Sequence, residues 1–266
     1  MSFRKWYFAA NATALRDAFD LIHVAVVSAR QNTGLVPFCI IEDTDHCDRV
    51  AANVEKLIAS GVTIVLRNAE VFPMVQNAYG AAAAKAYNGH WLRTDIPYIE
   101  REEEFVLYTD IDVMFRADVS DNDLRPKFIA CGPEHKQDDW SYFNTGVLVM
   151  NVPSMRATRP EFVEVIREHM PRAAPYDDQT MYNICYRDRY DRLPLEWNWK
   201  PYWGYNAHAK IVHFHGPKPN IAKHLREGGT VPGMPIYREM FDRDREGYAL
   251  HIAEFDRYLA MPLADR

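Results

Sequence analysis

The chain has 266 residues, of which 48% are hydrophobic and 13% aromatic, so it can bury a large core and is not a disordered protein. Its formal net charge of −6 provides no general positive field, which disfavours nucleic acid as a main partner. Four cysteines without zinc-like spacing, and no apolar segment long enough for a bilayer, predict a cytoplasmic protein without a transmembrane segment.

Apolar runs alternate with helical periodicities along the first half of the chain. Strands are predicted at 6–10, 36–43 and 62–66, and helices at 14–30 and 49–60, with Gly61 ending the second helix. This alternation implies right-handed crossovers and predicts an α/β fold with a largely parallel sheet. A helical segment at 91–99 then leads into another buried strand.

That strand belongs to the stretch "EFVLYTDIDVMF", residues 104–115, and ends in Asp110 and Asp112. Carboxylates two positions apart can point into one crevice, with Ile111 turned toward the core. Ligands of open α/β sheets bind at the carboxyl ends of strands, and two adjacent carboxylates are typical ligands of a divalent cation. The alternative is a solvated turn, because aspartate is common where strands end.

A second group of polar residues lies in "AKIVHFHGPKPN", residues 209–220. A short apolar strand delivers His213 and His215, either of which is suited to bind a transition metal. Gly216 permits a close backbone approach, and Lys218 is a compact charge suited to phosphate oxygens. The alternative is a hydrogen-bonded core histidine followed by an ordinary surface lysine.

Two further motifs lie between these groups. The strand "YFNTGVLVMN", residues 142–151, begins with the amide Asn144, and "DDQTMYN", residues 177–183, opens a helix with Asp178 and Gln179. An acid in that position is also a common helix N-cap. Taken in order, Arg93, "YTDIDV", "FNTGVLVMN", Asp178-Gln179 with Asn183, "LPLEWN" and "HFHGPKP" resemble the family 8 retaining glycosyltransferases over residues 6–219.

The resemblance implies a GT-A fold, which is Rossmann-like with a mostly parallel central sheet and helices on both faces. It implies one glycosyltransferase domain at 1–219 with a helical C-terminal extension at 220–266 packed on it. The implied reaction is metal-dependent transfer of a sugar, with retention of anomeric configuration, from a nucleotide-diphosphate sugar to a hydroxyl of a saccharide or related acceptor. Relatives of this type act in polysaccharide or lipopolysaccharide biosynthesis.

The resemblance also implies roles for individual residues. The residues that would hold a divalent metal, manganese or else magnesium, are Asp110, Asp112 and His213. The residues that would contact the nucleotide sugar are Asn11, Arg93, Asp110, Gly216 and Lys218. The residues that would face the donor sugar and the acceptor are Asn144, Asp178 and Gln179. At the first strand, Asn11 and Thr13 stand where the family has acids and a base-stacking tyrosine, so a UDP-sugar donor rests on the resemblance alone.

Aromatic residues and the tail supply two more expectations. Trp140 and Tyr142, which follow the polar stretch 134–139, are candidates for contact with a sugar acceptor, whereas most aromatic residues at 197–205 are expected in the core. A helix predicted at 245–259 belongs to an acidic tail, which favours packing or homodimer formation over attachment to anionic lipid.

Two alternatives remain open for the sequence. A phosphatase of the haloacid dehalogenase kind also places Asp-x-Asp after a strand, but it normally continues with Gly-Thr, whereas Val113 and Met114 follow here. A non-catalytic sugar-nucleotide binding protein of the same fold is the other alternative. The retained set of Asp110, Asp112, His213 and Lys218 argues for an active enzyme.

Overall fold

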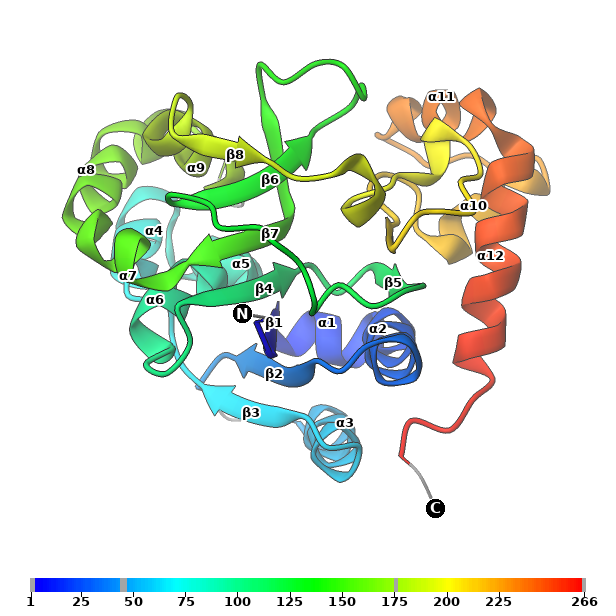
Figure 1. The fold of residues 1–266 in the computed structure, drawn as a ribbon, viewed down its shortest axis with the longest axis horizontal. Helices are drawn as coiled ribbons and strands as arrows, with labels where there is room; N and C mark the ends of the chain where they lie inside the picture. The colour runs from blue at the N-terminus through cyan, green and yellow to red at the C-terminus, as the bar shows by residue number, and fades with distance from the viewer. Residues whose placement is uncertain (1–2, 44–46, 175–176, 265–266) are drawn as a thin grey trace.

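The computed structural model describes residues 3–43, 47–174 and 177–264. Within these ranges, one seven-stranded sheet has the order β3-β2-β1-β4-β7-β6-β8 (Figure 1). Its strands are β1 (Lys5–Ala10), β2 (Val36–Ile41), β3 (Thr63–Leu66), β4 (Phe105–Thr109), β6 (Ile129–Pro133), β7 (Phe143–Asn151) and β8 (Tyr190–Arg192). A separate pair consists of β5 (Val113–Phe115) and β9 (Ile211–His213).

The first four strands of the sheet order, β3 to β4, are parallel, and β7 then runs antiparallel to both β4 and β6. Helices in the first half are α1 (Ala12–Asp17), α2 (Phe19–Asn32), α3 (Asp48–Ala59), α4 (Phe72–Tyr79), α5 (Ala81–Leu92), η1 (Arg93–Asp95) and α6 (Ile96–Ile99). Those that follow β7 are α7 (Val152–Ala157), α8 (Arg159–His169), η2 (Met170–Arg172), α9 (Asp178–Tyr186), η3 (Leu195–Trp197), η4 (Pro201–Trp203), α10 (Pro219–Arg226), α11 (Pro235–Arg243) and α12 (Arg245–Leu259).

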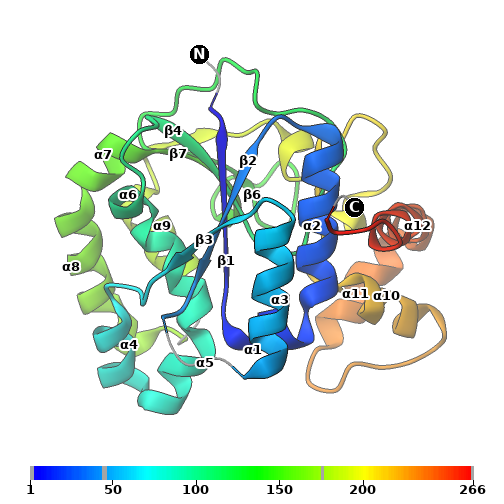
Figure 2. The ribbon, with the colours of Figure 1, turned by 90° about the horizontal axis from the view of Figure 1, so that it is seen from below.

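Alternate residues of the central strands enter two different hydrophobic clusters. In β1, Trp6 and Phe8 join the cluster that α1, α2 and α3 cover, whereas Tyr7 and Ala9 join the cluster that α4 to α9 cover. The period of two places successive side chains on opposite faces of the sheet. Figure 2 shows α2 and α3 on one side of the strands and α4 to α8 on the other. The predicted α/β architecture is therefore confirmed.

One predicted element is wrong. The segment 14–30 was expected to be a single helix, but the chain leaves helical geometry at Ala18, with φ −123° and ψ 23°, and continues as α2. No residue here disfavours a helix. The break follows from packing, because α1 contacts α3 while α2 turns to pack against β5. Ala18 itself lines a cavity at the strand ends.

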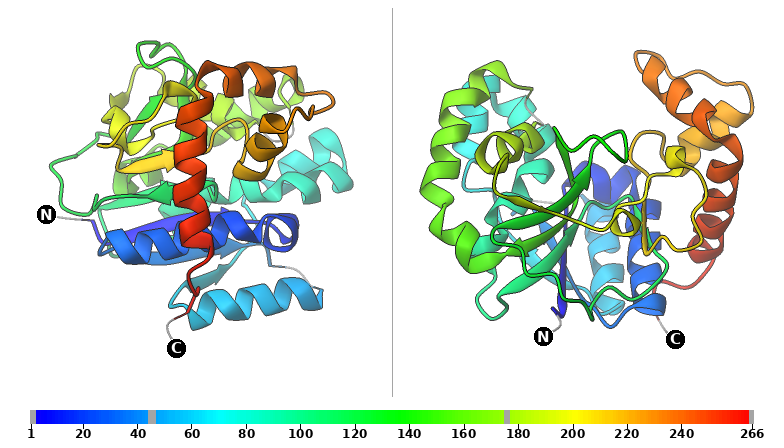
Figure 3. Two further views of the ribbon diagram at one scale, coloured as in Figure 1. Left: turned by 90° about the vertical axis from the view of Figure 1, so that its right-hand side faces the viewer. Right: turned by 45° about the horizontal axis from the view of Figure 1, so that its top comes forward.

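The C-terminal helices form a third hydrophobic cluster with η4. Its members are Tyr202, Ala222, Leu225, Met240, Phe241, Tyr248 and Ile252. Helix α12 crosses α2 (Figure 3, left), and Asn32 at the end of α2 donates a hydrogen bond of 2.8 Å to the Tyr258 hydroxyl. The boundary between residues 219 and 220, and any dimer through α12, stay predictions. None of the helices in the described ranges is both long and apolar enough to cross a membrane.

Glu100 holds the turn that leads into β4. Its Oε1 accepts the backbone N–H groups of residues 101–103 at 2.6–2.9 Å, and its Oε2 accepts the Tyr7 hydroxyl at 2.8 Å. Burial alone would raise the pKa of this carboxyl, but these donors outweigh it and lower the pKa to about 2. The ionised carboxylate therefore fixes the point where β4 starts.

We expect Glu100→Gln to lower the free energy of unfolding by about 2 kcal/mol at neutral pH. Because the folded pKa lies below the unfolded one, this contribution is present above about pH 4.3 and is lost as the pH falls toward 2. Urea denaturation of both proteins across this range measures the difference. Glu104→Gln, at an exposed site, should show no such dependence, and a difference that stays constant with pH would contradict the assignment.

Candidate functional site

Three side chains with metal-binding atoms converge where β4 ends. Asp110 to Asp112 connect β4 to β5, and the Asp110 N–H donates to the Gly146 carbonyl at 2.8 Å, which extends the β4–β7 ladder by one residue. In the antiparallel pair β5–β9, Val113 lies opposite His213. Asp110, Asp112 and His213 consequently each offer one ligand atom within 4.8 Å of the others.

Gly146 provides the space for this convergence. A Cβ at this position would lie 2.2 Å from Cε1 of His213 and 2.9 Å from Oδ2 of Asp110. Real Cβ atoms do not approach other heavy atoms so closely, so only glycine fits without moving the imidazole. Gly146, the glycine of "FNTG", is therefore required because it leaves room for His213 and Asp110 to pack against β7.

Asp112 and Lys218 form a partly buried ion pair at the same place. The Lys218 Nζ donates to Oδ2 of Asp112 and, at 3.1 Å, to the Phe214 carbonyl. Burial alone would raise the pKa of Asp112, but the ammonium outweighs it and holds that pKa below its ordinary value. Asp112 is almost fully buried, whereas the Asp110 side chain is 32% exposed, so Asp110 faces the open side.

Arg93 joins two carboxylates from different elements. Only 4% of it is exposed, and its Nη1 lies 3.1 Å from Oδ1 of Asp110 while its Nε lies 2.8 Å from Oδ2 of Asp178. Nη1 also donates to the Thr145 carbonyl at 2.7 Å. Burial raises the pKa of Asp178 to about 7, even with Arg93 beside it. Arg93 therefore links the end of β4 to the start of α9 through its two ion pairs.

The N-cap of α9 is Asp177, not Asp178. The Asp177 side chain accepts the Thr180 N–H at 3.2 Å, whereas Asp178 is the first helical residue and is 1% exposed. The capping alternative for Asp178 is therefore excluded, and its carboxylate is available to hold Arg93.

Asn144 uses all four of its hydrogen-bonding positions inside the protein. Its Nδ2 donates to Oε2 of Glu134 at 2.8 Å and to Oε1 of Gln179 at 3.3 Å. Its Oδ1 accepts from the Gly146 N–H and from Nδ2 of Asn198, both at 3.0 Å. The structure therefore brings Asn144 and Gln179 together near the aspartates, but the Asn144 amide has no capacity left for a ligand.

His215 points away from the aspartates. Its Nε2 lies 3.0 Å from Oε1 of Glu134, and its Nδ1 lies 2.9 Å from the Tyr202 hydroxyl. Glu134, His135 and His215 form a second group with closely spaced ligand atoms. Of the two histidines that the sequence left open, His213 is the one beside Asp110 and Asp112.

Gly216 has a φ of 85°, which favours glycine, and a Cβ there would lie 2.5 Å from Sδ of Met240. The close backbone approach that the sequence predicted at Gly216 is therefore an approach to Met240 of α11. Asn11 is also committed internally, because its Oδ1 caps α1 by accepting the Ala14 N–H and its Nδ2 donates to the Ala86 carbonyl, both at 2.8 Å.

A cavity of about 350 Å³ opens above these residues. Its apolar lining comes mainly from β1 and the α1–α2 segment, and its polar lining includes Arg93, Asp110, Asp112 and Lys218. The other residues that line it are Asn11, Gly89, His90, Tyr108 and Ile111. The volume lies within the range of small-molecule sites.

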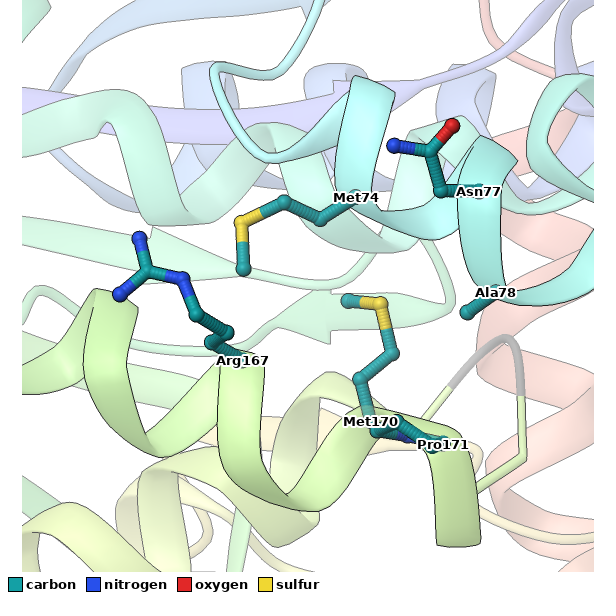
Figure 4. A pocket seen from close by; sticks show the side chains of 6 residues that line it. All are labelled: Met74, Asn77, Ala78, Arg167, Met170 and Pro171. Atoms are coloured by element: carbon teal, nitrogen blue, oxygen red, sulfur yellow. The ribbon is translucent and has the colours of Figure 1, made fainter.

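Another cavity, of about 360 Å³, lies between α4 and the α8–η2 segment (Figure 4). Met74 and Met170 extend into it, and Arg167 lies at its side. None of the residues that the sequence predicted to be functional line this cavity. Predicted site residues with ionisable side chains line the cavity at the strand ends instead.

Sequence reasoning missed three residues beside the site, of which Lys200 and Asn198 are buried. Glu134 follows β6, and its desolvation is outweighed by hydrogen bonds from His215 and Asn144, which lower its pKa below the ordinary value. Burial lowers the pKa of Lys200 to about 7, and its Nζ donates to the Pro133 carbonyl at 2.9 Å. The only signals in the sequence were the "LPLEWN" motif, which Asn198 ends, and the polar stretch 134–139, which Glu134 begins.

The arrangement suits a divalent cation and an anion together. Two carboxylate oxygens and one imidazole nitrogen are a donor set that fits Mn²⁺ better than Ca²⁺, which prefers oxygen alone. Lys218 lies next to this set and can donate to phosphate oxygens.

Comparison with known proteins gives a family and a fold. The model of the family described as Glycosyl transferase family 8 matches residues 23–219. No curated protein matches the chain.

Several solved structures are similar. The apo form of the glycosyltransferase GlyE of Streptococcus pneumoniae TIGR4 has a TM-score of 0.59 and 17% identity, over 97% of this chain and 64% of the GlyE chain. This chain thus spans less than two thirds of the length of GlyE.

The galactosyltransferase LgtC, in complex with donor and acceptor sugar analogues, has a TM-score of 0.59 and 18% identity, over 89% of this chain and 94% of its own. Mouse xyloside xylosyltransferase 1 has a TM-score of 0.54 and 13% identity, over 79% and 97%. At these identities the likeness shows the fold, which is GT-A.

We expect Gly146→Ala to weaken Mn²⁺ binding by at least about 100-fold, because the new Cβ must displace His213 or Asp110. Overpacking should also cost about 1–3 kcal/mol of stability. Isothermal titration with Mn²⁺ and thermal melting measure the two effects. Gly34→Ala is the matched control, since its Cβ would meet nothing within 4 Å. Wild-type Mn²⁺ affinity in Gly146→Ala would contradict the assignment.

Proposed function

We propose a reaction for this chain from the premise that it belongs to glycosyl transferase family 8 and is a glycosyltransferase. It transfers a sugar from a nucleotide-diphosphate sugar, a UDP-sugar, to a hydroxyl of a saccharide acceptor, with a divalent metal, Mn²⁺ or else Mg²⁺, and with retention at the anomeric carbon. The observation that carries the proposal is the convergence of Asp110, Asp112, His213 and Lys218, of which the two aspartates and the lysine line the cavity.

The main task of the site is to stabilise the leaving group. Transfer breaks the bond between the anomeric carbon and a diphosphate oxygen, and negative charge develops on that oxygen. A divalent cation held by Asp110, Asp112 and His213 supplies a positive charge next to the diphosphate. Lys218, which now pairs with Asp112, donates from its ammonium to a phosphate oxygen.

We assign Asp178, together with Arg93 that holds it, to the part of the site that faces the donor sugar. Asp178 is 1% exposed and both of its oxygens lie near Arg93, at 2.8 and 3.5 Å. A covalent nucleophile needs an oxygen free to reach the anomeric carbon, so this burial supports an orienting role for Asp178 and front-face attack by the acceptor. In that reaction the departing phosphate takes the proton of the acceptor hydroxyl.

Gln179 lies next to Asp178 and is held by hydrogen bonds to Asn144 and Thr145. Its Oε1 accepts the Thr145 N–H at 2.8 Å and the Asn144 amide at 3.3 Å. Its Nε2 is the part of the side chain that we assign to the sugar or the acceptor. For Asn144 we propose a role in positioning, because its amide is fully used within the protein.

The acceptor is proposed to lie in a groove next to Gln179. The groove has a volume of about 790 Å³, and its walls are Asp138, Trp140, Ser141, Tyr142, Arg187, Asp188, Tyr190 and Arg192. The Tyr142 hydroxyl is 2.8 Å from Oγ1 of Thr180, the residue after Gln179, so the groove adjoins the site. Aromatic planes beside polar groups suit saccharide rings.

Trp140 is held in place within this groove. Its carbonyl accepts the Tyr190 hydroxyl at 2.6 Å, and the Arg192 guanidinium lies 4.7 Å from the centre of its ring. A fixed ring loses little entropy when a ligand binds. This supports the acceptor contact that the sequence predicted for Trp140 and Tyr142.

We also propose a reducing, cytoplasmic setting, which the free thiols of Cys39, Cys47, Cys131 and Cys185 support. The phosphatase alternative needs Asp110 as a covalent nucleophile, whereas its Oδ1 accepts the Tyr108 hydroxyl at 2.9 Å and pairs with Arg93. These contacts support a holding role for Asp110 instead.

A panel of nucleotide sugars with and without Mn²⁺ tests the proposal by thermal melting. At about 100 times its dissociation constant, the correct donor should add about 2.7 kcal/mol, and only with the metal. Asp112→Asn should abolish this shift and lower turnover at least about 100-fold. Its apo form should still fold but be less stable than wild type, because Lys218 loses the carboxylate with which it pairs, although this lysine is one-third exposed and can turn to solvent.

Asp121→Asn, an exposed change of the same kind, is the matched control and should behave as wild type. Stabilisation by a donor in the presence of a chelator, or full turnover of Asp112→Asn, would rule out the metal assignment. An insoluble Asp112→Asn protein would instead indicate a structural role.

For the acceptor groove, we expect Trp140→Ala to raise the acceptor KM up to about tenfold while the donor KM stays unchanged, since a ring contact contributes about 0.5–1.5 kcal/mol. Steady-state kinetics with the best saccharide of an acceptor panel measure both constants. Tyr205→Ala is the control, because this exposed ring contacts Arg116 and His251 instead. A rise in donor KM alone would refute the groove as the acceptor site.

A further inference from the structure

A chain of buried amides connects Glu134 to His213. Its links are Asn144, with 3% exposure, and Asn198, with none. Glu134 accepts from Asn144, Asn144 accepts from Asn198, and Asn198 lies 2.9 Å from Nδ1 of His213. The order of donors and acceptors along this chain determines where the proton of the imidazole lies.

The orientation of Asn144 is fixed by groups that have only one role. The Gly146 N–H can only donate, and it lies 3.0 Å from one end of the amide, which must be Oδ1. The opposite end lies 2.8 Å from the Glu134 carboxylate, which accepts when ionised and therefore requires Nδ2 there. Both neighbours therefore give the same assignment for the two ends of the amide.

The same logic fixes Asn198. One end of its amide lies 3.0 Å from Oδ1 of Asn144, which is an acceptor, so that end must be Nδ2. The other end is then Oδ1, and it lies 2.9 Å from Nδ1 of His213. An amide oxygen cannot donate, so Nδ1 of His213 must carry the proton.

We propose that Asn198 is a positioning residue that holds the proton of His213 on Nδ1, so that the lone pair on Nε2 faces Asp110 and Asp112. Nε2 lies 3.4 Å from Oδ1 of Asp112. With the proton on Nε2, the imidazole would donate to Asp112, and both groups would be occupied by each other. The Asn198 carbonyl prevents this, because it would then face an unprotonated Nδ1 at 2.9 Å.

The backbone around Asn198 is shaped for this contact. The β6–β7 register shifts between Cys131 and Gly132, and a Cβ on Gly132 would lie 3.3 Å from Cβ and Nδ2 of Asn198. Glycine at the bulge therefore leaves room for the amide to reach Asn144 and His213. The chain of amides thus depends on the "LPLEWN" motif and on the end of β6, neither of which contains a residue that the sequence predicted to bind a ligand.

The use of this tautomer for metal binding rests on the proposed function, whereas the tautomer itself does not. The first experiment therefore uses the metal-free protein with ¹⁵N-labelled histidine, at a pH well above the ordinary histidine pKa. Two-bond ¹H–¹⁵N correlations report which ring nitrogen carries the proton, and His213→Gln identifies the signals. We expect Nδ1–H in the wild type and a shift toward Nε2–H in Asn198→Ala.

Mn²⁺ titration then measures the consequence. The dissociation constant should rise about 10- to 100-fold in Asn198→Ala. Asn198→Asp should restore the Nδ1–H tautomer, because its carboxylate still accepts from the ring. Asn151→Ala is the matched control, since it removes two hydrogen bonds, to Pro126 and Ser154, at the far end of β7. It should lower the melting temperature without changing the tautomer or Mn²⁺ affinity.

Nε2–H in the wild-type protein would overturn the proposal, and so would an Asn198→Ala protein whose tautomer is that of wild type. If Asn198→Ala does not fold, the wild-type and Asn198→Asp spectra still decide. If even the wild type fails to bind Mn²⁺, the proposed metal role is wrong, while the tautomer of the metal-free protein still tests the part played by Asn198.

Discussion

Repulsion between three neighbouring carboxylates is the constraint on which this molecule depends. Asp110, Asp112 and Asp178 lie close together where β4 ends, and two of them, Asp112 and Asp178, are buried. Arg93 pairs with Asp110 and Asp178, and Lys218 pairs with Asp112. Each cation belongs to a different part of the chain, so the charges also tie those parts together.

The reversal of strand direction in the middle of the sheet makes this concentration possible. Because β7 runs antiparallel to β4, its amino end lies at the edge where the parallel strands have their carboxyl ends. Asn144 and Gly146 are therefore beside Asp110, and α9, which comes after α7, α8 and η2, brings Asp178 to Arg93. The pair β5–β9 adds His213 from the last third of the chain.

The sequence predicted most of the frame and the identity of the main polar residues, because periodicity and ordered motifs are local signals. It failed where packing decides. Nothing in 14–30 announces the break at Ala18, which follows from contacts with other elements. The roles expected of Asn11 and Asn144 stay predictions, and the sequence could not show that both side chains form hydrogen bonds within the protein. Asn198 could be found only once its neighbours were known.

The pairing of Val113 with His213 joins residues about a hundred positions apart and has a consequence for biosynthesis. A chain emerging from the ribosome presents Asp110 and Asp112 long before His213 exists, and closing so long a loop is entropically unfavourable until other contacts hold its ends. The parallel strands must therefore assemble while Asp110 and Asp112 still lack His213 and Lys218, with Arg93 as the cation already present in the chain. The full set of three ligands that we propose for a metal exists only after β9 has paired with β5.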